Sequence, residues 1–229
     1  GAGLVGSEMC IRDRYQRGLG VNPFGRVAGT RVFNGPRYET SKCGNSSTTM
    51  LQGSYQSGAR IVSNSWGCTT FGCTTSYTTT AQIYDAAVRD ADGDTPGNQE
   101  LLILFSAGNV STAGVGSPAN GKNVIAVGAS ENVQPSWLDS CGYGPSDADN
   151  AQDIARYSSR GPAPGGRVKP DLVAPGTHVT GTASTASIYN GWPYATRIYP
   201  AARWNSQPRQ VPATASPPWP VSLPWPHIG

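Results

Sequence analysis

Short apolar runs alternate with helix-like stretches through the middle of this chain. Residues 101–105 form a continuous apolar run (LLILF), residues 123–128 repeat the pattern (NVIAVG), and residues 60–64 (RIVSN) and 171–174 (DLVA) are shorter. A continuous apolar run of this length is typical of a strand that is buried on both faces of a parallel sheet. The runs therefore predict the strands of a parallel sheet.

Two other stretches have the features of helices. Ser46 and the residues after it can cap a helix that Gly58 would end. A second helix is predicted over about residues 79–90, where Ile83, Tyr84, Ala87 and Val88 have the spacing of one helical face. Because helices alternate with strands, the sequence predicts an α/β fold.

Ligands of such folds bind beyond the carboxyl ends of the strands. The segments that follow the predicted strands are residues 65–67, 106–109 and 128–130. The first two combine small and polar residues with a tryptophan and an asparagine, and we expect the chemistry of the molecule there.

Residues 191–229 differ in composition from the rest of the chain. They hold nine of the nineteen prolines and four of the six tryptophans, and their only charged side chains are those of Arg197, Arg203 and Arg209. Each proline removes a backbone donor, which disfavours helices and central strands. One interpretation is a polyproline ligand segment, and the other is a disordered or non-native tail. We expect the second.

The net charge of +3 belongs to this tail, because the other residues include fourteen basic and fourteen acidic side chains. The composition therefore gives no sign of a nucleic-acid partner. No run of about 18 apolar residues is present, so we expect no transmembrane helix. A secretory signal peptide is not visible either.

The first fourteen residues also differ from the rest of the chain. The string LVGSEMCIRDR at residues 4–14 resembles a translated sequencing adapter. We therefore expect residues 1–14 to be a non-native leader, residues 15–190 to be the informative domain, and residues 191–229 to be the tail. On this division Cys10 has no role, and the native protein extends upstream.

Five segments of the central part resemble the subtilisin-like serine peptidases, in the order that this family has them. They are residues 63–67 (SNSWG), 105–109 (FSAGN), 116–119 with 124–129 (GSPA and VIAVGA), 157–162 (YSSRGP) and 169–176 (KPDLVAPG). Each segment is a weak match when taken alone. Together they extend over about residues 58–184 and make a specific resemblance.

The resemblance implies a doubly wound parallel sheet of the subtilisin type, which would be incomplete in this chain. It also implies a secreted serine endopeptidase that hydrolyses polypeptides through an acyl-enzyme. The chemistry of such an enzyme needs no cofactor, although structural calcium is common in the family, and no metal ligand is assigned.

Asn109 matches the asparagine that forms the oxyanion hole in this family. Its side-chain amide is a neutral donor for the negative charge that develops on a carbonyl oxygen under attack. Gly108 and Ala107 precede it, and a glycine allows the backbone to come close to a substrate. The alternative for an asparagine after a glycine is an ordinary turn residue.

Ser65, Trp66 and Gly67 match the segment that pairs with the substrate backbone as an added strand. Edge pairing gives affinity that tolerates many sequences, while side-chain pockets give specificity. Trp66 would border a substrate pocket, and its alternative is an ordinary aromatic residue of the core.

The family's catalytic triad of Asp, His and Ser is not recognisable. No histidine precedes residue 60, and no Gly-Thr-Ser motif follows Gly176. His178 lies in a segment (GTHVTGT) that resembles the catalytic-histidine motif in a shifted order, and we expect a surface position for it. This chain alone is therefore expected to be inactive.

Other candidate sites have weaker patterns. Asp90, Asp92 and Asp94 have only part of the spacing of a calcium loop, and a polar turn is the alternative. Asp147 and Asp149 have the same two interpretations. The cysteines could form disulfides between Cys68 and Cys73 and between Cys43 and Cys141, which in a secreted protein is more plausible than a zinc site.

Two functional hypotheses follow. The first is a fragment of a serine endopeptidase that retains its oxyanion asparagine and its substrate-binding strands. The second is a non-catalytic peptide-binding or structural module built on the same sheet. The complete reading frame would distinguish the two.

Overall fold

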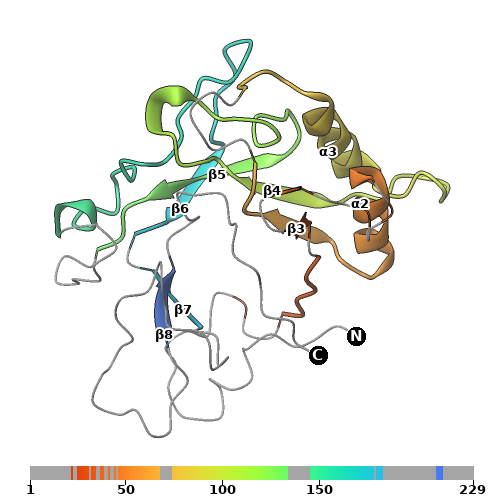
Figure 1. The fold of residues 1–229 in the computed structure, drawn as a ribbon, viewed down its shortest axis with the longest axis horizontal. Helices are drawn as coiled ribbons and strands as arrows, with labels where there is room; N and C mark the ends of the chain where they lie inside the picture. The colour runs from red at the N-terminus through yellow and green to blue at the C-terminus, as the bar shows by residue number, and fades with distance from the viewer. Residues whose placement is uncertain are drawn as a thin grey trace, which may run out of the picture.

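A four-stranded parallel sheet forms the centre of the molecule (Figure 1). The fold comes from a computed structural model that describes residues 22, 25–30, 32–34, 37–38, 41, 44, 46–67, 74–133, 145–177, 179–182 and 210–213. The strands are β3 (Ile61–Asn64), β4 (Leu102–Ser106), β5 (Ile125–Ser130) and β6 (Leu172–Pro175), and they lie in the order β3-β4-β5-β6. The parallel sheet predicted from the apolar runs is confirmed.

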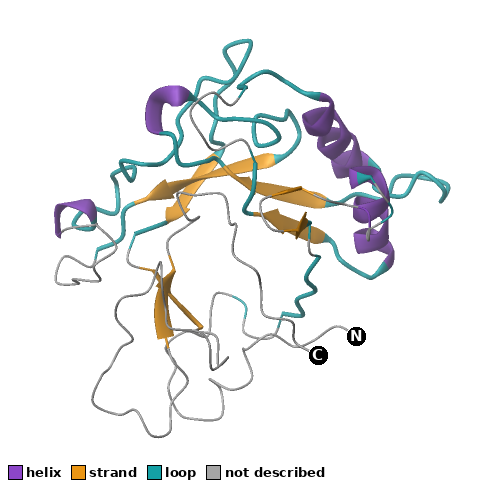
Figure 2. Ribbon diagram, viewed as in Figure 1, coloured by secondary structure: helices purple, strands orange, loops and turns teal. Residues whose placement is uncertain are grey.

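Two helices pack against each other beside this sheet (Figure 2). Helix α2 (Ser47–Gln56) begins where the Ser46 hydroxyl accepts a hydrogen bond from the Thr49 backbone N–H, as the predicted cap requires. Helix α3 (Thr79–Arg89) begins in the same way with Thr78 as its cap. The positions of both helices agree with the sequence prediction, and the fold class is α/β.

The core lies between these helices and one face of the sheet. It includes Leu51 from α2, Tyr84 from α3, Ile103 and Phe105 from β4, and Ala126 from β5. The side chains of these residues are fully buried or nearly so. Alternate residues of the strands thus supply the apolar layer that the helices cover.

The opposite face of the sheet is more exposed. Ile61 is 62% exposed, Leu102 is 43% exposed and Leu172 is 48% exposed. The strand register places these three residues on the face opposite Ile103 and Phe105. The prediction that residues 101–105 are buried on both faces is therefore wrong at Leu102, because both described α-helices pack on the other face.

Two short antiparallel pairs complete the described strands. Strand β1 (Phe33–Asn34) pairs with β2 (Arg37–Tyr38), and β7 (Val179–Thr182) pairs with β8 (Gln210–Ala213). Strand β8 lies in the proline-rich tail and contains Pro212. A proline disfavours a central strand but is tolerated in a two-stranded pair, where each strand has a free edge.

The connections between the central strands also contain two short 3-10 turns. They are η2 (Ser111–Ala113), which follows β4, and η3 (Pro145–Asp147), which lies between β5 and β6. Described residues of the connection from β5 to β6 bond to the carboxyl ends of β4, β5 and β6 or to the residues just after them.

Candidate functional site

The two segments predicted to carry the chemistry follow neighbouring strands. Asn64, at the end of β3, pairs with Phe105 in β4. Residues 65–67 and 107–109 therefore leave the same edge of the sheet side by side. The structure shows that the two segments are adjacent, while the roles of these residues stay predictions.

The turn after β4 is held against β5 and then changes direction at a glycine. The Ala107 backbone N–H donates to the Val127 carbonyl at 2.9 Å, so strand pairing continues beyond Ser106. Gly108 has a φ of 107°, a left-handed conformation that side chains disfavour. Asn109 follows at a partly buried position, immediately after this change of direction.

Trp66 packs onto the core through its ring. The indole makes edge contacts with the ring of Phe105, at a centroid separation of 5.4 Å, and with the ring of Tyr84, at 5.8 Å. Its N–H donates to Asn64 Oδ1 at 3.1 Å. These contacts are those of a core aromatic residue, and a role as a pocket wall stays a prediction. Ser65 and Gly67, on either side, are exposed.

Asn64 has a positioning role that the sequence did not reveal. Its side chain is 7% exposed, and its Nδ2 donates to the Leu104 carbonyl at 3.1 Å while its Oδ1 accepts from Trp66. One buried amide thus fixes the tryptophan relative to β4. The sequence feature that could have indicated this role is a polar residue at the last position of a strand, on the side that faces the core.

Residues 155–160, here called the crossing segment, run across the ends of three strands. Ala155 and Ser158 bond to Ala129 at the end of β5: the Ala155 N–H donates to the Ala129 carbonyl, and the Ala129 N–H donates to Ser158 Oγ at 2.9 Å. The Tyr157 hydroxyl donates to the Gly176 carbonyl after β6 at 2.8 Å. The sequence shows that most of these residues belong to a family motif, but it does not show which strands they bond to.

The crossing segment also contacts the turn around Asn109. The Ser159 N–H donates to the Gly108 carbonyl at 2.9 Å, and Ser159 Oγ accepts from the Val110 N–H at 3.1 Å. Ser159 has an exposed fraction of 0%. The candidate site is therefore built from two neighbouring strand ends, and Ser159 of the crossing segment binds one of them.

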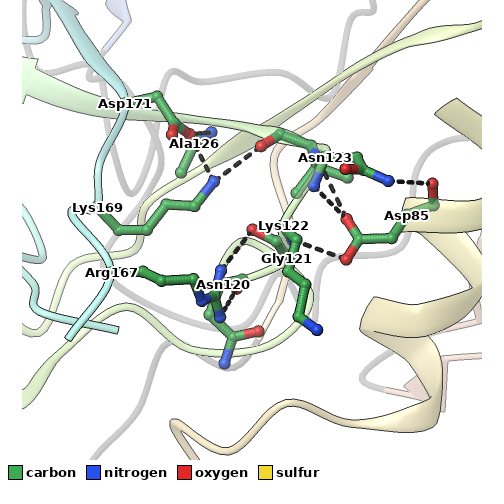
Figure 3. A network of polar contacts seen from close by, with 10 residues as sticks. Asp85, Asn120, Gly121, Lys122, Asn123, Ala126, Arg167, Lys169 and Asp171 are labelled. Carbon is green, nitrogen blue, oxygen red and sulfur yellow. Dashed lines mark hydrogen bonds and ion pairs between the residues drawn. The ribbon is translucent and has the colours of Figure 1, made fainter. Parts of the chain in front are cut away.

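A dense polar network lies at the opposite end of β5 (Figure 3). Asp85 of α3 is 5% exposed and accepts hydrogen bonds from the backbone N–H groups of residues 122–124 and from the Tyr77 hydroxyl. Burial raises the pKa of Tyr77, and its hydrogen bond to Asp85 adds to the rise.

The loop at residues 120–124 also contacts two positively charged side chains. Arg167 donates to the carbonyls of Asn120 at 2.8 Å and Gly121 at 3.2 Å. Lys169, whose side chain is 3% exposed, donates to the Val124 carbonyl at 2.8 Å and pairs with Asp171 at 2.6 Å. The network holds a loop in place between an anion and cations, and we assign it a structural role.

The aspartates proposed as a partial calcium loop are already engaged by hydrogen-bond donors. Asp92 accepts from the side chains of Gln52, Gln56 and Thr95, and Asp94 accepts from Gln52. Donors directed at these oxygens are the arrangement of a polar junction, which is the alternative that the sequence offered to a calcium loop.

Several other predictions fall outside the described residues. These are the histidine at His178 and the two proposed disulfides, Cys68 with Cys73 and Cys43 with Cys141. Within the described ranges, no group of three or more His, Cys, Asp or Glu side chains is arranged to hold a metal. In the same part of the chain, no helix has the length and apolar character needed to cross a membrane.

Comparison with known proteins gives one family match. The profile of the subtilase family (Peptidase_S8) matches residues 3–200. This range begins before residue 15 and ends after residue 190, so the division into leader, domain and tail stays a prediction. A search of curated proteins found no match.

Solved structures also resemble the chain. One of them is the structure of the prenylagaramide maturation protease PagA, which is 15% identical, with a TM-score of 0.40. The similarity covers 76% of this chain and 44% of that one. This chain thus spans less than half the length of that protease chain.

Proposed function

This chain belongs to the subtilase family, and we propose that it is part of a serine endopeptidase that cleaves polypeptides through an acyl-enzyme. The observation that supports this most directly is the turn at residues 107–109. It lies at the carboxyl end of β4, beside the end of β3, where an α/β sheet binds its ligands. We also propose that the parent enzyme is secreted.

Asn109 is proposed to donate its side-chain amide to the oxyanion of the tetrahedral intermediate. A neutral donor held in place before the reaction stabilises charge that appears only in the transition state. In subtilisin, removal of one such donor lowers turnover by about 10²–10³-fold. Gly108, with its positive φ, directs the chain so that Asn109 follows the strand end.

Residues 65–67 are proposed to pair with the backbone of the substrate. Strand β3 is at the edge of the described four-stranded sheet, so its outer side faces no described strand of that sheet. Ser65 and Gly67 are exposed, which leaves their backbone groups accessible to an extended peptide. Trp66 is then a neighbour of the bound peptide, while its ring contacts the core.

This chain by itself is proposed to be inactive. Its two histidines are His178, whose segment has the family's histidine motif in a shifted order, and His227, which lies in the tail. A fluorophosphonate probe that labels active serine hydrolases should therefore leave this chain unlabelled. Stoichiometric labelling would contradict the proposal of inactivity.

The oxyanion role is tested in the enzyme encoded by the complete reading frame. Asn109→Ala should lower kcat on a peptide substrate by about 10²-fold and leave KM nearly unchanged, because the lost bond forms mainly in the transition state. Asn150→Ala is the control, since Asn150 is exposed and its side-chain oxygen accepts from the Gln152 N–H in the connection between β5 and β6. Unchanged kcat for Asn109→Ala would refute the oxyanion role.

The same reading frame tests the enzyme hypothesis itself. Asp and His motifs upstream of residue 60 and a Gly-Thr-Ser motif downstream of Gly176 would support it. A complete frame that encodes none of them would favour the non-catalytic peptide-binding module.

A further inference from the structure

Ser159 bonds to the backbone on both sides of Asn109. Its N–H donates to the Gly108 carbonyl at 2.9 Å, and its hydroxyl oxygen accepts from the Val110 N–H at 3.1 Å. Gly108 and Val110 are the residues immediately before and after Asn109. One side chain together with its own backbone therefore fixes both neighbours of the proposed oxyanion donor.

The residues after Asn109 are held by the same segment. Ser111 has a φ of 52°, in the left-handed region that a serine rarely adopts. Its N–H donates to the Tyr157 carbonyl at 3.1 Å, and its carbonyl accepts from the Arg160 N–H at 2.9 Å. An unfavourable backbone conformation persists when surrounding bonds determine it, and the crossing segment supplies those bonds here.

The crossing segment is itself anchored on another strand. Ser158 accepts from the Ala129 N–H of β5, and the Ala155 N–H donates to the Ala129 carbonyl. The side chains of Ser158 and Ser159 are 1% and 0% exposed. The backbone bond from Ala155 to Ala129 remains when the Ser158 hydroxyl is removed, so the attachment of the segment to β5 does not depend on that hydroxyl alone.

We propose that Ser159 is a positioning residue that orients Asn109 for oxyanion binding, and this rests on the proposed peptidase function. The asparagine side chain has few torsions, so the location of its amide depends on the backbone from which it extends. A displacement of about 1 Å in an active site can cost about 10²-fold in rate. A hydroxyl that holds the turn from a buried position limits that displacement.

Two neighbouring serines make a matched comparison possible. Ser159→Ala and Ser158→Ala each remove one buried hydroxyl that accepts one backbone N–H bond. Only the first of these bonds involves a neighbour of Asn109. The two variants therefore separate the loss of a buried hydrogen bond from the loss of the position of Asn109.

The first experiment uses this chain and needs no activity. Amide exchange and ¹⁵N NMR spectra are recorded for both variants. For Ser159→Ala, the Val110 N–H should exchange at least tenfold faster and the side-chain amide signals of Asn109 should shift or broaden. For Ser158→Ala, the Ala129 N–H should exchange faster while the Asn109 signals remain in place. Unchanged Asn109 signals in Ser159→Ala would overturn the proposal.

The second experiment uses the enzyme from the complete reading frame. Ser159→Ala should lower kcat about tenfold with little change in KM, and Ser158→Ala should leave kcat within about twofold of the parent. The double variant Asn109→Ala/Ser159→Ala should be no slower than Asn109→Ala alone, since Ser159 acts through Asn109. A further tenfold loss in the double variant would contradict this mechanism.

The kinetics of the Asn109 and Ser159 variants distinguish a failure of the proposed peptidase function from a failure of the proposed positioning role. If Asn109→Ala lowers kcat and Ser159→Ala does not, the peptidase function stands and the positioning role is refuted. If Asn109→Ala has no effect, the oxyanion assignment fails and the positioning role for catalysis fails with it. Should Ser159→Ala fail to fold, Ser159→Cys keeps a similar volume with a weaker acceptor, and it should give a smaller change in the same direction.

Discussion

Asp85 illustrates how one buried carboxylate can organise a loop. Its two oxygens accept three backbone N–H bonds from the segment before β5, and its own backbone carbonyl accepts from the Asn123 side chain. Arg167 bonds to carbonyls on the preceding residues. Backbone N–H groups of residues 122–124 thus point at the Asp85 carboxylate, and the carbonyls of residues 120–121 point at Arg167. The peptide dipoles of the loop are therefore oriented favourably toward both charges.

Asp85→Asn should reduce the free energy of unfolding by roughly 2–4 kcal/mol, because it removes a charged acceptor and places an amide against backbone donors. Urea denaturation measures the change. Asp149→Asn is the control, since Asp149 is exposed and should shift stability by less than about 0.5 kcal/mol. Equal stabilities for the Asp85 and Asp149 variants would contradict the assigned structural role.

The sequence predicts the behaviour of a single residue best where that behaviour depends on its own backbone conformation. It marks Gly108 as a special position, and the φ of 107° provides a conformational reason for a glycine there. For Trp66 the sequence leaves two interpretations, a pocket wall and a core aromatic residue, since it does not show which residues the indole contacts. Ser159 and Asn64 lie in recognisable motifs, but their partners are set by the tertiary structure.

At the scale of elements, α2 is joined to the turn after α3 by amide–carboxylate bonds. Gln52 and Gln56 of α2 both donate to Asp92, at 2.7 and 3.1 Å. The glutamines are one helical turn apart, and they bring two donors to the same carboxylate. The junction connects two elements that are about forty residues apart in the chain.

This junction makes part of the stability depend on pH. The hydrogen bond from Gln56, followed by that from Gln52, lowers the pKa of Asp92 below its ordinary value of 3.8. The folded state therefore prefers the charged carboxylate more than the unfolded state does. The stabilisation is present above the ordinary pKa and is lost as the pH falls through the lower pKa of the folded state.

Asp92→Asn should accordingly make the acid-induced loss of stability shallower below the ordinary pKa, while it lowers stability at neutral pH. Thermal unfolding monitored from pH 2 to pH 7 tests this, with Asp153→Asn as the exposed control. The effect of Asp92→Asn should be equal with calcium and with a chelator. A stability loss that appears only in the presence of calcium would instead support a calcium site at these aspartates.

At the scale of the whole molecule, the two faces of the sheet have different surroundings. Ile103 is 0% exposed beneath the helices, while its neighbour Leu102 is 43% exposed on the other face. Alternate residues of one strand therefore contribute very unequally to the core.

Ile103→Ala should cost about 2–5 kcal/mol of unfolding free energy, because it leaves a cavity in a packed core. Leu102→Ala should cost less than about 1.5 kcal/mol, in proportion to the smaller apolar area that it withdraws from water. Chemical denaturation of the two variants measures the difference. Similar losses would mean that the exposed face is covered in solution.

Much of the fold is predictable because its signals are local. The strands at residues 101–105 and 123–128 follow from apolar runs, and the helices follow from caps and periodicity. Their boundaries differ from the structure by one or two residues. The adjacency of residues 65–67 and 107–109 depends in addition on the strand order, which the structure supplies by pairing β3 with β4.

The sequence by itself determined the strands of the four-stranded sheet, the helix caps and the individual family motifs, since each depends on residues within a few positions of one another. Only the tertiary structure decided which face of the sheet the helices cover, that Trp66 packs on Phe105, and that Ser159 binds the turn around Asn109. Val110 and Ser159 are separated by 49 positions in the chain. Contacts over such separations arise from packing of the whole chain, and no local pattern encodes them.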